Sequence, residues 1–396
     1  MEVGVYGVHF PPFELATGAA VGAEAAGMDF IIYGDQLCFT HPTSLWTPDI
    51  TDVAALLPTF NAFMDTGPII AAAAAQTSTI RFHYGVIDAV RRPPSVIAQS
   101  LLTLDHATKG RVRLLLANGE NKQMKPYGIA RKGANEKLSD SLRVIKKFLA
   151  TGEPITDDGL VWNHRDAIVA VHPYGEVPPP VYVAGGGPEV LELIGKYADG
   201  WFTYIPGASE DSPEHFAKEV ATVREHAERA GRDPDGIKIS VTMITVLDED
   251  EANLAELREH PFVLWNTMLA TPTSATYTRW GLEHPYGEKW MFSRDCIPPW
   301  ISREEALDVC ARTPREAVDK VQFVGTSAQV LERLQPYLDL GVIDELSLVN
   351  YAELCGVKYM ASAGEAIVKL LSKVKGVESA TGSGVTTLVT EGLSHQ

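Results

Sequence analysis

The chain has 396 residues, of which 45% are hydrophobic and 21% are charged. This composition can bury a large core and fits neither a disordered nor a fibrous protein. The formal net charge of -17 at pH 7 argues against nucleic acid and anionic membranes as partners, because both are bound by clustered Lys and Arg.

Eight short apolar runs alternate with amphipathic stretches along the chain. They cover residues 3–10, 30–34, 80–86, 112–117, 181–185, 200–205, 237–247 and 345–350. Parallel strands that are covered by helices on both faces have this near-continuous apolar character. Eight repeats predict an α/β fold of the (β/α)8 TIM barrel type. A doubly wound open sheet is the alternative, because periodicity does not by itself establish closure.

Two long segments break this rhythm, residues 36–66 after the second strand and residues 250–325 after the seventh. Both insertions follow the carboxyl ends of strands, where barrels carry their active sites, so they are predicted to form lids or substrate walls. Their aromatic residues either line a roomy apolar pocket or attach the insertions to the barrel. These residues are Trp46, Phe262, Trp265, Trp280, Tyr286, Trp290 and Trp300.

The chain end and the cysteines complete the outline. From residue 376 the sequence is small and polar, which predicts one barrel domain over residues 1–375 and a flexible tail over 376–396. Four widely spaced cysteines without metal-binding spacing indicate free thiols in a reducing compartment. They are Cys38, Cys296, Cys310 and Cys355. Without a signal segment or a long apolar run, we expect a cytoplasmic protein with no membrane insertion.

If the barrel closes, the residues that follow its strands meet at one mouth. In chain order they are His9, Asp35, Gln36, Gly85, Val86, Asp88, Asn118, Gly119, Glu120, Ala184, Gly185, Gly186, Gly187, Tyr204 and Asn350. Glu120, with the amides of Asn118 and Gln123, supplies a proton-transfer candidate and hydrogen-bond partners for a planar heterocycle. A solvated carboxylate at a helix entry is the other interpretation of Glu120.

The sequence "VAGGGPEV" places three glycines before a helix that begins with Pro188. Backbone N–H groups in such a turn are unobstructed and can bind an anion, although glycine-rich turns also occur for geometric reasons alone. Histidines within strands are more often packed than catalytic, and His9 lies nearer its strand end than His83. The chain lacks the Gly-x-Ser-x-Gly, Walker and His-Glu-x-x-His motifs, so hydrolase, phosphoryl-transfer and zinc-protease functions are not favoured. No metal site is predicted.

These segments resemble the bacterial luciferase-like superfamily and, within it, the oxidoreductases that use the deazaflavin coenzyme F420. The resemblance covers about residues 1–375 and rests on "YGDQL", "GVIDAVRRPP", "ANGENKQMKPYG" and "YVAGGGPEVLELIGKYADGWF". Two further segments, "GLEHPYGEKW" and "FVGTSAQVLERL", resemble mycobacterial ketoreductases and related hydroxymycolate-type dehydrogenases.

The resemblance implies F420 as the cofactor, with FMN as the alternative. It implies cofactor contacts at Asp35, Gly85, Val86, Asp88, Glu120, Ala184, Gly186 and Gly187, with a cis peptide bulge at Gly85–Val86. From their place at the same strand ends, Asn118, Gln123 and Gly185 are predicted cofactor contacts as well. Glu120, His9 and Gln36 are the catalytic candidates. Gln36 stands where many F420 dehydrogenases have a histidine, and an amide binds an oxygen but takes up no proton. His9 or His41 could substitute for that imidazole.

The resemblance also implies hydride transfer between the deazaflavin and a carbonyl, alcohol or activated alkene of a sizeable apolar substrate. An FMN-dependent luciferase-like monooxygenase and a noncatalytic deazaflavin-binding barrel are the alternatives. Relatives are commonly dimers, so we expect a homodimer. The other expected binding partner is a small-molecule substrate.

Overall fold

The computed structural model describes residues 1–271 and 273–376, and within them eight parallel strands form a closed barrel. The strands are β1 (Glu2–Tyr6), β2 (Phe30–Tyr33), β3 (Arg81–Asp88), β4 (Val112–Ala117), β7 (Val181–Ala184), β8 (Gly200–Ile205), β9 (Lys238–Leu247) and β11 (Glu345–Asn350). Each pairs with the next, and β11 pairs with β1. Closure confirms the predicted (β/α)8 barrel and excludes the open sheet.

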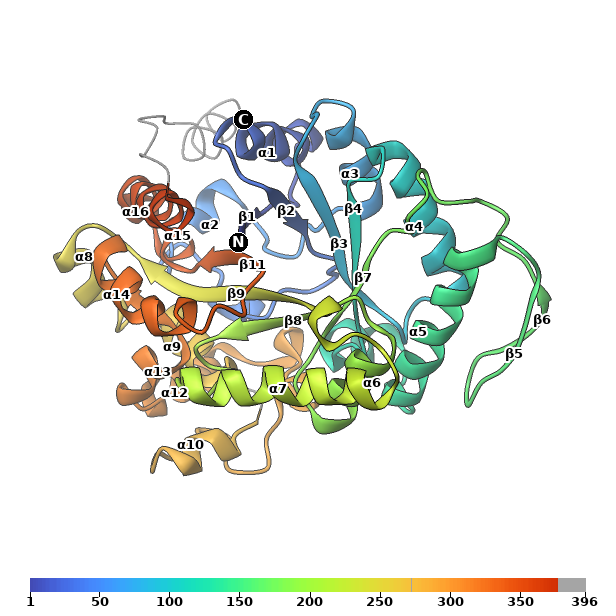
Figure 1. The fold of residues 1–396 in the computed structure, drawn as a ribbon. Coiled ribbons are helices and arrows are strands. Elements are labelled where there is room, and N and C mark those ends of the chain that lie inside the picture. The colour runs from blue at the N-terminus through green and yellow to red at the C-terminus, as the bar shows by residue number, and fades with distance from the viewer. Residues whose placement is uncertain (272, 377–396) are drawn as a thin grey trace.

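Helices surround this barrel (Figure 1). The principal ones are α1 (Phe13–Ala25), α3 (Thr66–Ala74), α4 (Pro94–Thr108), α5 (Ala134–Thr151), α6 (Pro188–Tyr197), α7 (Pro213–Arg229), α14 (Ser327–Leu338) and α16 (Val357–Lys375). They pack on alternate strand residues such as Ile31 and Phe82 in the largest apolar cluster. The intervening residues, among them Phe30 and Ile32, form a separate cluster inside the barrel, as the two-residue period of strands requires.

Every predicted run overlaps one barrel strand, and the first run differs most from the structure. The prediction extends to residue 10, whereas β1 ends at Tyr6. The neighbouring strand β2 ends at Tyr33, so the chain has few ladder partners beyond Gly7, whose N–H group still donates to the Ile32 carbonyl at 2.8 Å. Residues after Gly7 therefore leave the sheet although they are apolar.

Strand β3 carries the irregularity that the resemblance predicts. Its register against β4 shifts between Tyr84 and Ile87, and the Gly85–Val86 peptide bond is cis. Gly85 has a φ of 137°, and a Cβ atom there would collide with the Leu115 carbonyl oxygen. Only glycine fits this close approach of two strands.

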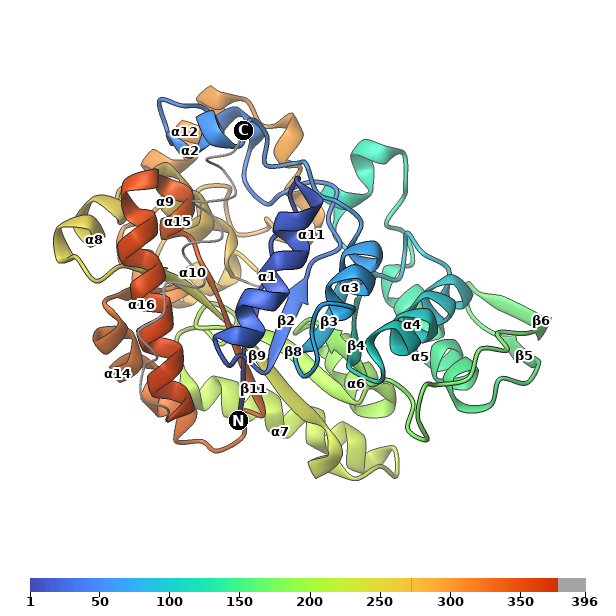
Figure 2. The same cartoon turned by 90° about the horizontal axis from the view of Figure 1, so that it is seen from above.

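Long segments follow β2 and β9. The first contains η1 (Thr43–Leu45) and α2 (Val53–Leu56). The second contains α8 (Glu251–Leu257), α9 (Pro261–Leu269), α10 (Ala275–Arg279), α11 (Phe292–Asp295), η5 (Pro298–Trp300), α12 (Arg303–Arg312), α13 (Glu316–Val321) and β10 (Phe323–Gly325), which pairs with β9 outside the ring. Figure 2 shows α2, α9 and α12 gathered at the end of the barrel opposite the N-terminus. The two segments and α15 (Ala352–Cys355) share a second apolar cluster.

The remaining elements lie at the periphery. β5 (Ile155–Asp158) and β6 (Asn163–Ala167) form an antiparallel hairpin that projects beside α5 (Figure 1), and η4 (Pro234–Gly236) precedes β9. The four cysteines lie within the described residues and are free, as predicted, and their side chains are buried. No helix of the described part of the chain is long and apolar enough to cross a membrane. Residues 377–396 of the predicted tail lie outside the described residues.

Candidate functional site

Tyr204, near the end of β8, shows that distant strand ends converge at one mouth. Burial raises the pKa of its hydroxyl group, and the nearby charges of Glu120 and Glu219 raise it further, together with Tyr351. Glu120 follows β4, Glu219 lies on α7 and Tyr351 follows β11. The structure therefore brings together the strand ends that the barrel topology predicts to meet.

Asp35 and Asp88, two of the predicted cofactor contacts, meet on Arg91. Asp35 Oδ2 lies 2.7 Å from Arg91 Nη2, and Asp88 Oδ2 lies 3.1 Å from Arg91 Nε. Arg92 Nη2 binds the second Asp35 oxygen at 2.9 Å. Burial raises the pKa of Asp88, although N–H groups of Val90 and Arg91 and the guanidinium group oppose this shift. Neither arginine was predicted as a site residue, although both stand within four residues of Asp88 in the sequence "DAVRR".

Gly119 explains why β4 is followed by Asn-Gly-Glu. Its φ is 72°, and a Cβ atom at this position would collide with the Asp88 carboxylate and the Met124 side chain. A glycine is required for this conformation and this close approach. The turn leaves the Glu120 side chain 36% exposed, whereas the side chains of Asp35 and Asp88 are 7% and 5% exposed. Glu120 is thus the most accessible carboxylate of the three.

Lys122 connects Glu120 to the segment after β2. It lies on η2 (Asn121–Gln123), and its side chain is only 2% exposed. Its Nζ atom lies 3.2 Å from Glu120 Oε2, 3.2 Å from Gln36 Oε1 and 2.9 Å from the Cys38 carbonyl oxygen. Lys122 was not predicted as a site residue, although it stands between the candidates Glu120 and Gln123 in the sequence "GENKQ".

Gln123 binds the same segment through its amide group. Its Oε1 atom accepts the Leu37 N–H group at 2.7 Å, and its Nε2 atom donates to the Cys38 carbonyl oxygen at 3.2 Å. The predicted residues Gln36, Glu120 and Gln123 therefore belong to one cluster. Because both ends of the Gln123 amide are engaged with backbone groups, its visible role is to hold the loop after β2.

Two histidines that could replace the missing imidazole are buried and hydrogen-bonded. His9 Nε2 accepts the Gly34 N–H group at 2.5 Å, and burial lowers the pKa of the ring to about 4. His41 Nε2 donates to the Phe262 carbonyl oxygen at 3.0 Å, and burial lowers its pKa to about 3. Both rings are therefore neutral near pH 7.

His83 lies inside the barrel, away from the mouth. Its ring stacks on Phe30 with centroids 4.4 Å apart, and its Nε2 atom lies 3.6 Å from a Glu345 carboxylate oxygen. Burial lowers the pKa of His83 well below the usual value, and the charges of Arg113 and Arg81 lower it further. Glu345 opens β11, so His83 belongs to the amino-terminal end of the barrel.

The glycine turn before α6 is open. Gly185, Gly186 and Gly187 are exposed, the N-cap residue Gly187 has no side-chain cap, and a Cβ atom on Gly187 would meet nothing within 4 Å. Beside this turn, Asn118 Nδ2 donates to Asn135 Oδ1 at 2.7 Å, and Asn135 donates to Glu189 in the first turn of α6. The backbone of this turn is accessible to an anionic ligand.

Glu219 lies next to the turn, since a Cβ atom on Gly186 would be 3.8 Å from Glu219 Oε1. Burial raises the pKa of Glu219 from 4.5 to about 7, and the charge of Glu210 adds to this shift. Between pH 4.5 and 7 the folded protein therefore binds more protons than the unfolded chain, and stability falls as the pH rises.

Replacement of Glu219 by Gln is expected to remove this pH-dependent cost. The variant should exceed the wild type in unfolding free energy by about 1–3 kcal/mol at about pH 8, and by much less at about pH 5. Urea unfolding at both pH values measures the difference. Glu225→Gln, on the same helix but 61% exposed, is the control. Equal differences for Glu219→Gln at both pH values would contradict the prediction.

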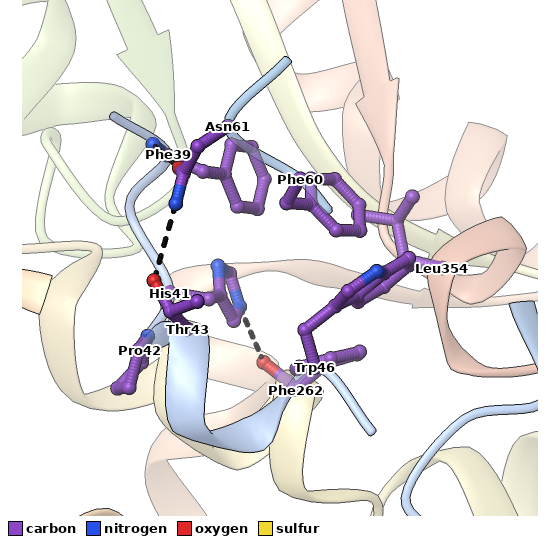
Figure 3. Close-up of a pocket in the computed structure, with 9 residues that line it drawn as sticks. All are labelled: Phe39, His41, Pro42, Thr43, Trp46, Phe60, Asn61, Phe262 and Leu354. Atoms are coloured by element: carbon purple, nitrogen blue, oxygen red, sulfur yellow. Dashed lines mark hydrogen bonds between the residues drawn. The ribbon is translucent and has the colours of Figure 1, made fainter. Parts of the chain in front are cut away.

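An aromatic hollow lies between the segments that follow β2 and β9 (Figure 3). It is lined by Phe39, His41, Pro42, Thr43, Trp46, Phe60, Asn61, Phe262 and Leu354. Trp46 and Phe262 are the two predicted pocket aromatics in this lining. Of the other five predicted aromatics, Trp265 belongs to the second apolar cluster, and Trp280, Tyr286 and Trp290 pack against it. These four side chains therefore chiefly attach the insertion to the barrel, as the alternative interpretation holds.

The fold and the mouth define a (β/α)8-barrel protein with an accessible carboxylate, buried ion pairs and an open glycine turn at the carboxyl ends of its strands. Residues 3–343 match the family described as luciferase-like monooxygenase. The chain belongs to this family.

Named relatives are similar over most of the chain. A phthiodiolone/phenolphthiodiolone dimycocerosates ketoreductase of Mycobacterium kansasii is 28% identical over 86% of this chain and 92% of the relative. An F420-dependent glucose-6-phosphate dehydrogenase of Nakamurella multipartita is 30% identical over 84% of this chain and 85% of the relative. The solved structure of an F420-dependent secondary alcohol dehydrogenase with an F420-acetone adduct has a TM-score of 0.67 and 17% identity, covering 93% of this chain and 98% of that one.

Proposed function

We propose that this chain is a coenzyme F420-dependent oxidoreductase that acts on a carbonyl, an alcohol or an activated alkene. The observation that carries the proposal is the accessible Glu120 carboxylate, held by Lys122 beside an open glycine turn at the barrel mouth. The relatives support it, because one is named an F420-dependent dehydrogenase and another a ketoreductase.

The residues at the mouth fit a flat, anionic cofactor. Tyr6, Val86 and Ala184 are half-buried and pack on the apolar cluster inside the barrel, so they give the mouth an apolar floor for a ring system. The turn of Gly185, Gly186 and Gly187 offers unobstructed backbone N–H groups for phosphate. Asp35 and Asp88, fixed by Arg91, would form part of the wall, with Asn118 and Gln123 as the remaining predicted contacts.

F420, when bound, supplies hydride chemistry, and the protein has to supply or remove a proton. We assign this proton transfer to Glu120. In the direction of ketone reduction its carboxyl group protonates the developing alkoxide, and in the reverse direction its carboxylate takes the alcohol proton. Gln36 Oε1 accepts from Lys122, so the Nε2 group of Gln36 is the donor that remains for a substrate oxygen.

His9 is assigned a structural role in this scheme. Its Nε2 atom is occupied by the Gly34 N–H group, and with a pKa of about 4 the ring carries no second proton to donate near pH 7. The Gly34 contact fixes the start of the segment that carries Asp35 and Gln36. His9 therefore positions the loop rather than exchanging protons with the substrate.

A sizeable apolar substrate remains part of the proposal. The aromatic hollow of Figure 3 is lined by the segment that begins beside Gln36 and Cys38. An apolar part of the substrate is proposed to contact this segment while a substrate oxygen faces the mouth. The homodimer, the cytoplasmic location and a single domain over residues 1–375 also remain predictions.

Titration with F420 and with FMN, followed by cofactor fluorescence, tests the cofactor. We expect saturable binding of F420, with FMN binding at least about tenfold more weakly, a difference of about 1.4 kcal/mol. Reduced F420 with a panel of ketones, and oxidised F420 with the matching alcohols, tests the reaction through deazaflavin absorbance. Binding without turnover of any substrate would favour the noncatalytic barrel.

An FMN-dependent monooxygenase is the second candidate, because the matched family is described as luciferase-like monooxygenase. Oxygen uptake during turnover separates the two reactions, since hydride exchange with a carbonyl consumes no oxygen. FMN binding together with substrate-dependent oxygen uptake would replace the proposed function by this one.

A further inference from the structure

Lys122 is a buried cation at the mouth with a complete set of acceptors. Its ammonium group has three N–H donors, and three oxygens lie within 3.2 Å, those of Glu120, Gln36 and the Cys38 carbonyl. A charge removed from water is costly unless it is paired and hydrogen-bonded. The acceptors come from the segments after β4 and β2, so the cation fixes one segment against the other.

A second cation near Glu120 is bound differently. Arg131 Nε donates to the Gly119 carbonyl oxygen at 2.7 Å, and the charge of Glu120 reaches this arginine over a longer range. Lys122 instead contacts the carboxylate itself. Of the two cations, Lys122 therefore acts most directly on the Glu120 carboxylate.

We propose that Lys122 is a positioning residue for proton transfer. It holds the Glu120 carboxyl group against residues 36–38, and its charge stabilises the carboxylate that remains after the proton has left. In that step one O–H bond of Glu120 breaks and one forms on the substrate oxygen, while Lys122 keeps its own protons. The inference rests on the proposed function, because it assigns a partner to the proposed proton donor.

A double-mutant cycle with Lys122→Met and Glu120→Gln tests the coupling. Lys122→Met is expected to lower kcat about 10- to 100-fold with an F420 Kd within about threefold of wild type. In the Glu120→Gln background the same change should cost about twofold or less, since the group it serves no longer ionises. Lys125→Met is the matched control, because Lys125 is exposed and lies over the Trp300 ring.

Lys122→Gln separates charge from tethering. Glutamine keeps a donor for the Cys38 carbonyl oxygen but carries no charge, so its kcat should stay close to that of Lys122→Met. Hydrogen–deuterium exchange of residues 36–41 in the cofactor-free protein reports the tether. We expect faster exchange in Lys122→Met and near-wild-type exchange in Lys122→Gln. If Lys122→Met does not fold, Lys122→Gln replaces it in the double-mutant cycle with Glu120→Gln.

The outcomes distinguish this inference from the proposed function. A wild type that binds no F420 overturns the proposed function, and the exchange measurement still tests the tether. Turnover in the wild type that Lys122→Met leaves within twofold overturns the inference alone. So do losses that simply multiply in the double variant, a near-wild-type kcat for Lys122→Gln, or unchanged exchange of residues 36–41 in Lys122→Met.

Discussion

Replacing Glu120 by Gln is expected to lower kcat by about 10²- to 10⁴-fold, the range that a lost general acid or base produces. The F420 Kd should stay within about threefold, so the loss appears in the chemical step rather than in binding. Steady-state turnover with a ketone or alcohol from the substrate panel, together with fluorescence titration of F420, measures both quantities.

The geometry makes this substitution a specific one. Gln has the shape of Glu, and its side-chain oxygen can still accept from Lys122, which lies 3.2 Å from the Glu120 carboxylate. Gly119 and the buried ion pair of Asp88 with Arg91 hold the turn from the other side. The variant therefore keeps the cluster and removes the exchangeable proton of the carboxyl group.

Glu136→Gln is the matched control for this prediction. Glu136 is an exposed glutamate in the first turn of α5, which follows the same loop, and its replacement should leave kcat within about twofold. If Glu120→Gln turns over its substrate as fast as the wild type, the proton comes from another group, and the assignment of Glu120 fails.

The barrel was predictable because its strands are buried on both faces. Runs such as "FIIYG" and "VYVAG" contain almost only apolar residues, and each contains one barrel strand. The β5–β6 hairpin was not predicted, because its strands have the sequences "ITDD" and "NHRDA", in which apolar residues do not alternate with polar ones. β10 was not predicted either, because it has only three residues, which pair with β9 and are too few to show the periodicity of a strand.

The candidate site was predictable in position but not in its contacts. Topology alone brings the ends of β2, β3 and β4 together, so Asp35, Asp88 and Glu120 could be expected at one mouth. The cations that bind them were missed, because Arg91 and Lys122 stand in polar loops where sequence gives no sign of burial. The pairing is a tertiary property, and it decides which carboxylate is accessible.

Replacing Arg91 by Met is expected to lower the free energy of unfolding by about 3–5 kcal/mol, since it leaves the buried Asp88 carboxylate without its ion-pair partner and Asp35 with Arg92 alone. The Arg91 side chain is 9% exposed and contacts both Asp35 and Asp88, whose side chains are 7% and 5% exposed. Urea unfolding of the cofactor-free protein measures the loss. Arg92→Met is the matched control, because the Arg92 side chain is 23% exposed and its loss leaves Asp35 paired with Arg91.

The control Arg92→Met should lose only about 1–2 kcal/mol of unfolding free energy, because Arg91 still pairs with Asp35. Adding Asp88→Asn to Arg91→Met should recover part of the loss, since one uncompensated carboxylate is then removed. Equal and small losses for Arg91→Met and Arg92→Met would show that the cluster is not held by buried ion pairs. In that case the rigid wall that we assign to Asp35 and Asp88 would lack its physical basis.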